Sequence, residues 1–263
     1  MCDFNIYKVD NDWDEAFKSF TPFVDLESLY SFIDSQFDLY KNQINPPKDC
    51  VFRAFRCTPL SKVKVVLLGQ DPYPGHGVAD GLAFSARLQN KAPASLININ
   101  KELNLEYESN VPVILDLSYL AMQGVFLYNT SILSKDGEPL FFGNVDLFHK
   151  FSQCVIQKID SSNKGVVFIF LGGKAAYYER FINKEKNYVI KAPHPSPLSA
   201  YRGFFNSGVF KKANQLLEKE NKKAIDWLGL NINCWLALAY FLFKMGLLQN
   251  PDPKSGEQQL LFF

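Results

Sequence analysis

Four short apolar runs, each ending in glycine or polar residues, constrain the fold of this 263-residue chain more than any other feature. They are rich in β-branched and aromatic residues, as buried strands are, and a loop-forming segment follows each one. Segments with helical spacing separate them. Because strands that alternate with helices form parallel sheets, the sequence predicts a single α/β domain with a central, mostly parallel four-stranded sheet flanked by helices. The runs are VKVVLLG at 63–69, GVFLYNTSIL at 124–133, GVVFIFLGG at 165–173 and NYVIKA at 187–192.

The segments between these runs predict the helices. Residues 13–41 mix apolar and charged positions at helical spacing, and Ser95 is the expected N-cap of a helix that starts the segment SLININKELNLEYE. An amphipathic helix is expected over 145–160, with His149 at or near its surface. A last helix and a tail are expected over 209–227.

Composition places few limits on function. The hydrophobic fraction of 47% supplies one core, and the formal net charge of +1 provides no global basic field, although a small patch is enough for phosphate contacts. The five cysteines form no C-x-x-C pair, which argues against a zinc or iron–sulfur site and favours a reducing compartment. The polar N-terminus lacks a signal or transit pattern, so the expected location is cytoplasmic, or nuclear in a eukaryote, without membrane attachment.

Polar residues follow each predicted strand at its end. Because ligands of open parallel sheets bind at the carboxyl ends of the strands, we expect Asp71, Asn129, the pair Gly172–Gly173 and His194 to converge. Taken singly, each has a structural alternative. Asp71 suits a loop cap as well as a general base, and Asn129 suits a strand-end turn as well as an amide that reads a nucleobase edge. Phe84 suits the core as well as a stacking surface.

Taken together and in order, four motifs resemble the main uracil-specific branch of the uracil-DNA glycosylase family, and the resemblance runs from about Trp13 to Trp227. The motifs are GQDPYPGHGVADGLAFS at 69–85, SLININKEL at 95–103, QGVFLYNTSIL at 123–133 and HPSPLSAYRGFF at 194–205. The resemblance implies a monofunctional DNA repair hydrolase that flips deoxyuridine out of DNA and hydrolyses the N-glycosidic bond. The products are free uracil and an abasic site, and the family uses no metal and no cofactor.

The same resemblance implies the site residues. Asp71 matches the carboxylate that orients water and stabilises the positive sugar, and His194 matches the imidazole that hydrogen-bonds the uracil O2 as negative charge develops. Leu198 matches the apolar wedge that enters the base stack. The residues that match the uracil pocket are Gln70, Tyr73, Phe84 and Asn129, with the Tyr73 ring standing where the thymine methyl would be. Besides Leu198, those that match DNA contacts are Ser95, Lys174 and Ser196.

The chain departs from the family pattern at several positions near these motifs. The segment SKDGEPLFFGN lacks the Ser-His that usually follows the uracil-reading strand. The other departures are Pro74 and Asp80, where many members have His, Ala83, where many have Cys, and Gly172, where Trp is frequent. None of them removes a named catalytic residue, and we expect them to act on strand preference, rate or inhibitor binding.

The expected domain organisation is a catalytic domain over 1–230 and a C-terminal extension over 231–263. The extension holds ten consecutive apolar residues, too few to span a bilayer, which suit a helix packed on the domain or one that binds a partner. Its end, EQQLLFF, resembles peptides that bind the bacterial sliding clamp. Gln258, Leu261 and Phe262 fit that pattern, and a frame shifted to Gln259 is also open.

The expected partners are uracil-containing DNA, single- or double-stranded, a sliding clamp through the tail, and a proteinaceous inhibitor of uracil glycosylases. The chain is expected to be a monomer. The main alternative is a glycosylase-fold replication accessory protein with weak catalysis, and the presence of Asp71, Asn129 and His194 argues against it. A different base preference conflicts with Tyr73 and Asn129. A nucleobase deaminase lacks its zinc motif here, and no lysine stands where a Schiff-base lyase needs its nucleophile.

Overall fold

The computed structural model describes residues 4–87 and 91–230. Residues Met1–Ile225 form one compact unit and Asp226–Phe263 a second, of which only the start is described. The expected boundary after residue 230 therefore stays a prediction, and so does the apolar segment beyond it. Among the described helices, none is both long and apolar enough to cross a membrane.

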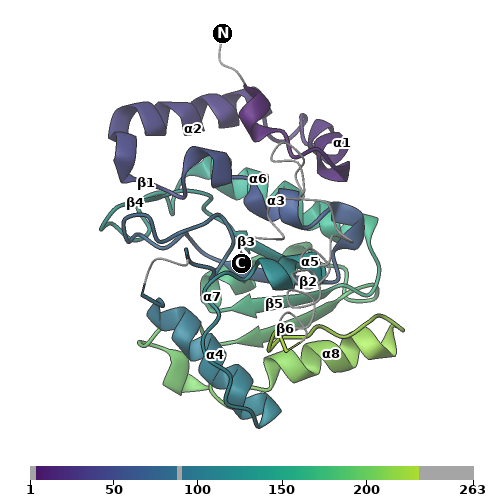
Figure 1. Ribbon diagram of the computed structural model, residues 1–263. Helices are drawn as coiled ribbons and strands as arrows, with labels where there is room; N and C mark the ends of the chain where they lie inside the picture. The colour runs from purple at the N-terminus through teal and green to yellow at the C-terminus, as the bar shows by residue number, and fades with distance from the viewer. Residues whose placement is uncertain (1–3, 88–90, 231–263) are drawn as a thin grey trace, which may run out of the picture. The chain divides into compact units, whose positions relative to one another are not determined.

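A four-stranded parallel sheet lies at the centre of the first unit (Figure 1). Its spatial order is β3 (Val125–Asn129), β2 (Val65–Gly69), β5 (Val167–Leu171) and β6 (Tyr188–Ala192), with every neighbouring pair parallel. The predicted fold class and strands are thus confirmed. The run 124–133 is a strand only as far as Asn129. The chain then turns into a two-residue strand, β4 (Ser134–Lys135), which pairs antiparallel with β1 (Ile44–Asn45).

The helices cover both faces of the sheet (Figure 1). The helical segment expected over 13–41 is two helices, and the last helix ends at Lys219, short of the expected tail. The α-helices are α1 (Asp12–Lys18), α2 (Leu26–Tyr40), α3 (Arg53–Cys57), α4 (Ala94–Tyr107), α5 (Ser118–Met122), α6 (Asp146–Ser162), α7 (Gly173–Ala176) and α8 (Val209–Lys219). The 3-10 helices are η1 (Phe4–Tyr7), η2 (Lys41–Gln43), η3 (Lys48–Cys50), η4 (Leu60–Lys62), η5 (Tyr177–Phe181) and η6 (Ala200–Arg202).

The expectation that Ser95 caps α4 was wrong. The helix begins one residue earlier, at Ala94, and its N-cap is Pro93, whose backbone is extended and whose side chain cannot accept a hydrogen bond. The proline ring fixes φ near the value that precedes a helix start, so the helix begins directly after it. Ser95 therefore lies in the first turn, beside amide groups that no side-chain cap satisfies.

An aromatic cluster fills one side of the sheet and joins α1 and α3 to β3. The Trp13 ring packs edge-on against Phe55 at 5.1 Å and stacks on Phe126 at 5.4 Å, measured between ring centroids. The Trp13 indole N–H donates to the Thr58 carbonyl over 2.9 Å, so its one polar group is satisfied in the core. On the sheet, α8 packs against β5 and β6. This packing leaves the carboxyl ends of the four strands as the edge from which the polar loops emerge.

Candidate active site

The carboxyl edge of the sheet brings together the residues that follow the four strands. Gly69 and Asn129 are register partners at the ends of β2 and β3. At the ends of β5 and β6, the Gly172 amide donates to the Ala192 carbonyl over 2.9 Å. The structure thus places Asp71, Asn129, Gly172 and His194 at this one edge, as the topology predicts.

Asn129 has the space for its side chain because its neighbour is glycine. A Cβ on Gly69 would collide with the Asn129 side-chain oxygen, and Ala83 lies close on the same side. Within the described part of the chain, the Asn129 amide has no hydrogen-bond partner. The loop backbone beside it is fixed, because the Ser131 amide donates to the Gln70 carbonyl over 2.8 Å. The amide therefore presents a donor and an acceptor from a rigid strand end.

Gln70 contributes a second unpaired polar group. Its Nε2 atom is buried and has no hydrogen-bond partner among the described residues. A buried donor without a partner costs free energy, about 1–3 kcal/mol by comparison with other proteins. A ligand or a water molecule that supplies an acceptor would recover this cost.

Asp71 lies in the loop after β2, and its carboxylate is held from across the site. Its Oδ2 accepts a hydrogen bond from the Leu140 amide over 2.9 Å. Burial raises the pKa of Asp71, while the Leu140 hydrogen bond and the positive charge of Lys174 lower it. The carboxylate is therefore partly desolvated and oriented by a backbone donor.

Two aromatic side chains stand next to Asp71 in the same loop segment. The Tyr73 hydroxyl donates to the Phe84 carbonyl over 3.1 Å, which joins the two halves of the loop. Phe84 is buried and has a φ of 64°, a left-handed conformation that costs a bulky residue about 1 kcal/mol or more. Its ring faces His194 with 6.0 Å between ring centroids. Burial raises the pKa of Tyr73, so its hydroxyl stays protonated.

A buried ionic network holds the loop that carries Phe84. Asp80 is 5% exposed and pairs with Arg53 over 2.7 Å, and Arg53 also pairs with Asp116 over 3.1 Å. The other Asp80 interactions are local, since it accepts from the Leu82 amide over 3.0 Å and from the Ser85 hydroxyl over 2.6 Å. Asp80, one of the departures from the family pattern, thus has a structural role in holding this loop.

His194 is held in one orientation by the loop that follows it. The Ser196 amide donates to the imidazole Nδ1 over 3.0 Å, and the Ser199 hydroxyl donates to the His194 carbonyl over 2.8 Å. An amide N–H is always a donor, so Nδ1 must be the acceptor and the neutral ring carries its proton on Nε2. Burial lowers the pKa of His194, which also favours the neutral ring.

Gly172 explains one departure in geometric terms. Its φ is 93°, in the region that favours glycine, and a Cβ there would press against the His194 Cβ at 3.0 Å. The missing side chain thus leaves room for the imidazole.

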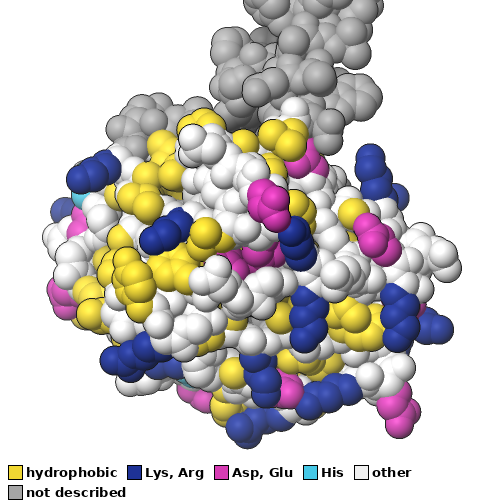
Figure 2. All heavy atoms as spheres, turned by 90° about the horizontal axis from the view of Figure 1, so that it is seen from below, with side chains coloured by type: hydrophobic (Ala, Val, Ile, Leu, Met, Phe, Trp, Pro, Cys, Tyr) yellow, Lys and Arg dark blue, Asp and Glu magenta, His cyan; other side chains and the backbone are white. Residues whose placement is uncertain are grey.

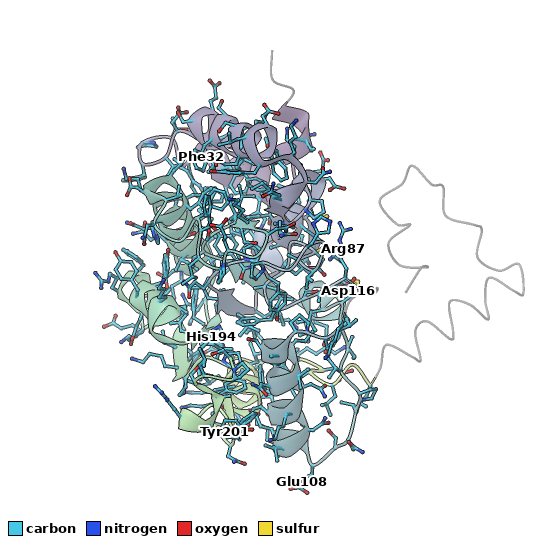
Figure 3. All side chains as sticks on the ribbon, turned by 90° about the vertical axis from the view of Figure 1, so that its left-hand side faces the viewer. Phe32, Arg87, Glu108, Asp116, His194 and Tyr201 are labelled. Atoms are coloured by element: carbon cyan, nitrogen blue, oxygen red, sulfur yellow. The ribbon has the colours of Figure 1, made fainter. Side chains whose placement is uncertain are left out.

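The residues expected to touch DNA lie around this edge. Leu198 is 86% exposed and lies in the loop beside α4. Tyr201, which was not among the predicted DNA contacts, lies in η6 and is 79% exposed. Figure 3 shows His194 beside the first turns of α4 and Tyr201 beside its later turns. The Asn98 amide of α4 donates to the Pro195 carbonyl over 2.7 Å, which fixes this loop to the helix.

The charges near this loop are dispersed. The Lys101 ammonium lies over the Phe205 ring, 4.6 Å from its centroid. On the face drawn in Figure 2, lysine and arginine side chains are distributed among hydrophobic and acidic ones. Across residues 4–87 and 91–230, no group of three His, Cys, Asp or Glu side chains is arranged to hold a metal ion.

Several contacts at the site involve residues that sequence reasoning did not single out: Leu140, Ser199, Arg53, Asp116 and Asn98. Asn98 and Ser199 lie within the quoted motifs, although nothing in those motifs marks them as contact residues. Leu140, Arg53 and Asp116 lie outside the motifs and act on other segments through a backbone amide or a buried charge, so no motif reveals these three. The departures at Asp80 and in SKDGEPLFFGN were the available signal, because Asp80 belongs to the Arg53 network and Leu140 to that segment. The clamp-like residues Gln258, Leu261 and Phe262 lie outside the described residues.

Comparisons with known proteins identify the family of the chain. The family model of the Uracil DNA glycosylase superfamily matches residues 55–218. The uracil-DNA glycosylase of Proteus mirabilis is 44% identical over 70% of this chain and 81% of its own length. That of Fusobacterium nucleatum is 40% identical over 84% of this chain and 96% of its own length.

Solved structures show the same fold. The crystal structure of mimivirus uracil-DNA glycosylase superposes with a TM-score of 0.75 at 26% identity, covering 82% of this chain and 85% of that one. The family match spans the sheet, the Asp71 loop, Asn129 and the His194 loop, so the chain belongs to the uracil-DNA glycosylase superfamily.

Proposed function

We propose that this edge of the sheet binds a deoxyuridine flipped out of DNA and hydrolyses its N-glycosidic bond, with Asp71 and His194 as the catalytic residues. Family membership makes uracil excision from DNA, as a step of DNA repair, the activity of the chain.

The orientation of His194 is the observation that carries the proposal. Because Nδ1 accepts the Ser196 amide, the proton on Nε2 is available to the substrate. As the C1′–N1 bond breaks, its electron pair passes to the base and negative charge develops on O2. A neutral imidazole that donates from Nε2 stabilises this charge without giving up its proton.

Asp71 is placed to act on the sugar side of the same bond. Loss of the base leaves positive charge on the sugar, and a carboxylate at the reacting carbon lowers the energy of that state. Water then forms the new bond at C1′, and its proton passes to the carboxylate. Burial raises the pKa of Asp71, and the Leu140 hydrogen bond and the charge of Lys174 oppose that rise and so favour the ionised carboxylate.

The pocket residues account for selection of uracil. The unpaired amide of Asn129 offers a donor and an acceptor to the pairing edge of the base, and the buried Gln70 Nε2 offers a further donor. Phe84 supplies a ring for stacking. The Tyr73 ring, fixed through its hydroxyl, occupies the place of a methyl group at C5 and so excludes thymine.

DNA contacts are proposed for the surrounding loops. Ser95 lies in the first turn of α4, where uncapped amides and the helix dipole favour a phosphate. Ser196 and Lys174 flank the His194 loop, and the exposed Leu198 side chain fills the space that the flipped base leaves in the stack. Hydroxyls and backbone amides bind phosphate without a large net positive charge, which agrees with the net charge of +1.

The test is release of uracil from a single-stranded oligonucleotide with one deoxyuridine, using a thymine oligonucleotide as the control substrate. The wild type should release uracil only. Asp71→Asn and His194→Leu should each lower kcat by about 100-fold or more, because each removes a charge or donor that acts in the transition state. Wild-type protein that binds the DNA and releases no base would refute the proposal and favour an accessory binding role.

Two further partners follow from similarity. The mimivirus enzyme has been crystallised in complex with UGI, and we propose that a proteinaceous inhibitor of this kind binds the same DNA-contacting edge here. We also propose that the tail, through Gln258, Leu261 and Phe262, binds a sliding clamp and so raises the effective concentration of the enzyme at replicating DNA. A chain cut after Gly256 should then lose clamp binding and keep uracil release. Equal clamp binding by both chains would refute the tail's role.

A further inference from the structure

The segment from Ser134 to Leu140 runs along the Asp71 loop and donates to it at three successive points. The Ser134 hydroxyl donates to the Tyr73 carbonyl over 3.4 Å, and the Gly137 amide donates to the Pro74 carbonyl over 2.8 Å. The third donor is the Leu140 amide, which reaches the Asp71 carboxylate. This segment therefore determines where the catalytic loop and its carboxylate lie.

The same segment and loop are two of the places where the chain departs from its family. Pro74 stands where many members have His, and SKDGEPLFFGN replaces the usual Ser-His segment. In the structure these two departures meet through the Gly137–Pro74 hydrogen bond. The arrangement that orients Asp71 thus includes two of the departures from the family pattern.

Asp136 is the anchor of the segment. Its Oδ1 accepts from the Asn45 side chain over 2.5 Å, its Oδ2 lies 2.5 Å from His76 Nδ1, and its amide donates to the Gln43 carbonyl over 2.8 Å. Asn45, which is buried, also accepts from the Gly77 amide over 3.2 Å. One carboxylate thus ties the segment to β1 on one side and to the 74–77 part of the catalytic loop on the other.

The segment needs such an anchor because its far end is strained. Leu140 has a φ of 63°, a left-handed conformation that is unfavourable for a branched side chain. A turn held in this conformation relaxes unless other contacts fix it, and a relaxed turn would move the Leu140 amide away from Asp71. Asp136 and Gly137 supply the fixed points between the turn and the catalytic loop. Further fixed points are the Leu140–Gly143 backbone bond, the Lys135–Glu138 pair, and the rings of Phe141 and Phe142, which pack on Tyr40 and Phe32.

We propose that Asp136, paired with His76, is a positioning residue that holds the Leu140 amide on the Asp71 carboxylate. The inference rests on the proposed role of Asp71. Asp136 touches neither substrate nor the reacting atoms, and it acts through the turn and through the loop that carries Pro74. Its loss should lower the rate of bond cleavage more than it lowers DNA binding.

The experiment compares Asp136→Ala with a matched control, Glu138→Gln, in the full chain. Glu138 lies in the same turn and pairs with Lys135 over 2.7 Å, but its side chain is half exposed and contacts neither the loop nor Asp71. Rates are measured on a single-stranded oligonucleotide with one deoxyuridine. Asp136→Ala should lower kcat by about 10- to 100-fold, the range for losing one hydrogen bond to a charged group, with KM changed less than about threefold. Glu138→Gln should match the wild type.

The pH profile separates positioning from simple loss of stability. The Leu140 hydrogen bond lowers the pKa of Asp71, and the other charge that acts on Asp71 is Lys174, which the variants leave unchanged. Release of the Leu140 amide should therefore move the acid limb of the kcat profile to higher pH. If the variant were only less stable, its acid limb would lie at the same pH as that of the wild type when both are measured at a temperature where the variant is folded.

Two milder variants decide the matter if Asp136→Ala does not fold. His76→Ala removes the exposed partner of the pair, and Asp136→Asn keeps an oxygen for Asn45 while losing the charge. Both should lower kcat and shift the acid limb, by less than Asp136→Ala would. A folded variant whose kcat and whose acid limb of the pH profile both match the wild type would overturn the positioning role alone. A wild-type protein that releases no uracil would overturn the proposed function itself.

Discussion

Gly69 and Asn129 are register partners at the ends of neighbouring strands, and the Asn129 side-chain amide occupies the space that a Cβ on Gly69 would fill. Gly69→Ala should therefore displace the amide and lower kcat/KM for uracil release by about 10- to 100-fold. The comparison is Val66→Ala, a buried change in the same strand away from the site. This control should lower the melting temperature and leave kcat/KM near that of the wild type. If Gly69→Ala had the same kcat/KM as the wild type, uracil release would not depend on this position of the Asn129 side-chain amide.

Tyr73→Ala should open the pocket to a base with a methyl group at C5. The ring is fixed by the hydrogen bond of its hydroxyl to the Phe84 carbonyl, so its removal leaves space and no polar replacement. We expect detectable thymine release from a thymine oligonucleotide, together with slower uracil release. Tyr73→Phe, which keeps the ring, should still reject thymine. Thymine release by the Phe variant would mean that the hydroxyl, and not the ring, sets the specificity.

Leu198→Ala should affect duplex DNA more than single strands. The side chain is almost fully exposed, and a wedge acts only where a base stack must be opened. We expect kcat/KM to fall by about 10-fold or more on duplex DNA and by less than about threefold on a single strand. Leu39→Ala removes another exposed leucine, from α2, and should change neither value. Equal losses on both substrates would argue against a wedge.

Asp80→Ala should destabilise the protein, because it removes one of the two carboxylates that pair with the buried Arg53. Breaking a buried ion pair from one side costs about 3 kcal/mol in the free energy of unfolding. Urea denaturation measures this loss. Asp10→Ala, which removes an exposed pair with Lys8, should cost less than about 1 kcal/mol. A similar cost for both changes would show that the buried network contributes little.

Glu106 should make the stability of the protein fall as pH rises. Burial, together with the neighbouring Glu102 carboxyl, raises the pKa of Glu106 to about 7 from 4.5, although the Phe210 and Lys211 amides lower it. The folded state then binds a proton that the unfolded state has released. Stability from this group is complete below about pH 4.5 and is lost as pH rises to about 7, by on the order of 2 kcal/mol.

Urea denaturation of the wild type and of Glu106→Gln between pH 4.5 and 8 tests whether the stability contributed by Glu106 decreases as pH rises. The stability of the wild type relative to the variant should decrease over that interval. Glu108→Gln changes an exposed carboxyl near the end of the same helix and should leave the pH dependence as it is. A wild type that gains stability relative to Glu106→Gln as pH rises would contradict the assigned shift.

Much of the catalytic edge could be predicted because its residues follow strands in chain order. Each strand is a short apolar run, and the parallel arrangement brings the residues after β2, β3, β5 and β6 to one side. The position of Ser95 could not be read in the same way, because the N-cap is Pro93, two residues before the expected serine cap. The fixed backbone of Pro93 thus determined where the helix begins, against the tendency of Ser95 to act as an N-cap.

The contacts that orient the catalytic groups could not be predicted, because they join distant segments through groups that every residue possesses. The Leu140 amide reaches Asp71 across 69 positions of the chain, and nothing in the leucine side chain marks that amide as different. The Arg53 network and the pair formed by Glu102 and Glu106 depend likewise on how the helices pack.

The sequence by itself thus determined the fold class, the family and the set of polar residues at the strand ends, because periodicity and motif order are properties of the chain. Only the tertiary structure decided which way those residues face. The proton on His194 Nε2 follows from the Ser196 amide, and the orientation of Asp71 follows from a turn anchored by Asp136. Hydrogen-bond direction and strain are properties of positions in space, which exist only once the chain has folded.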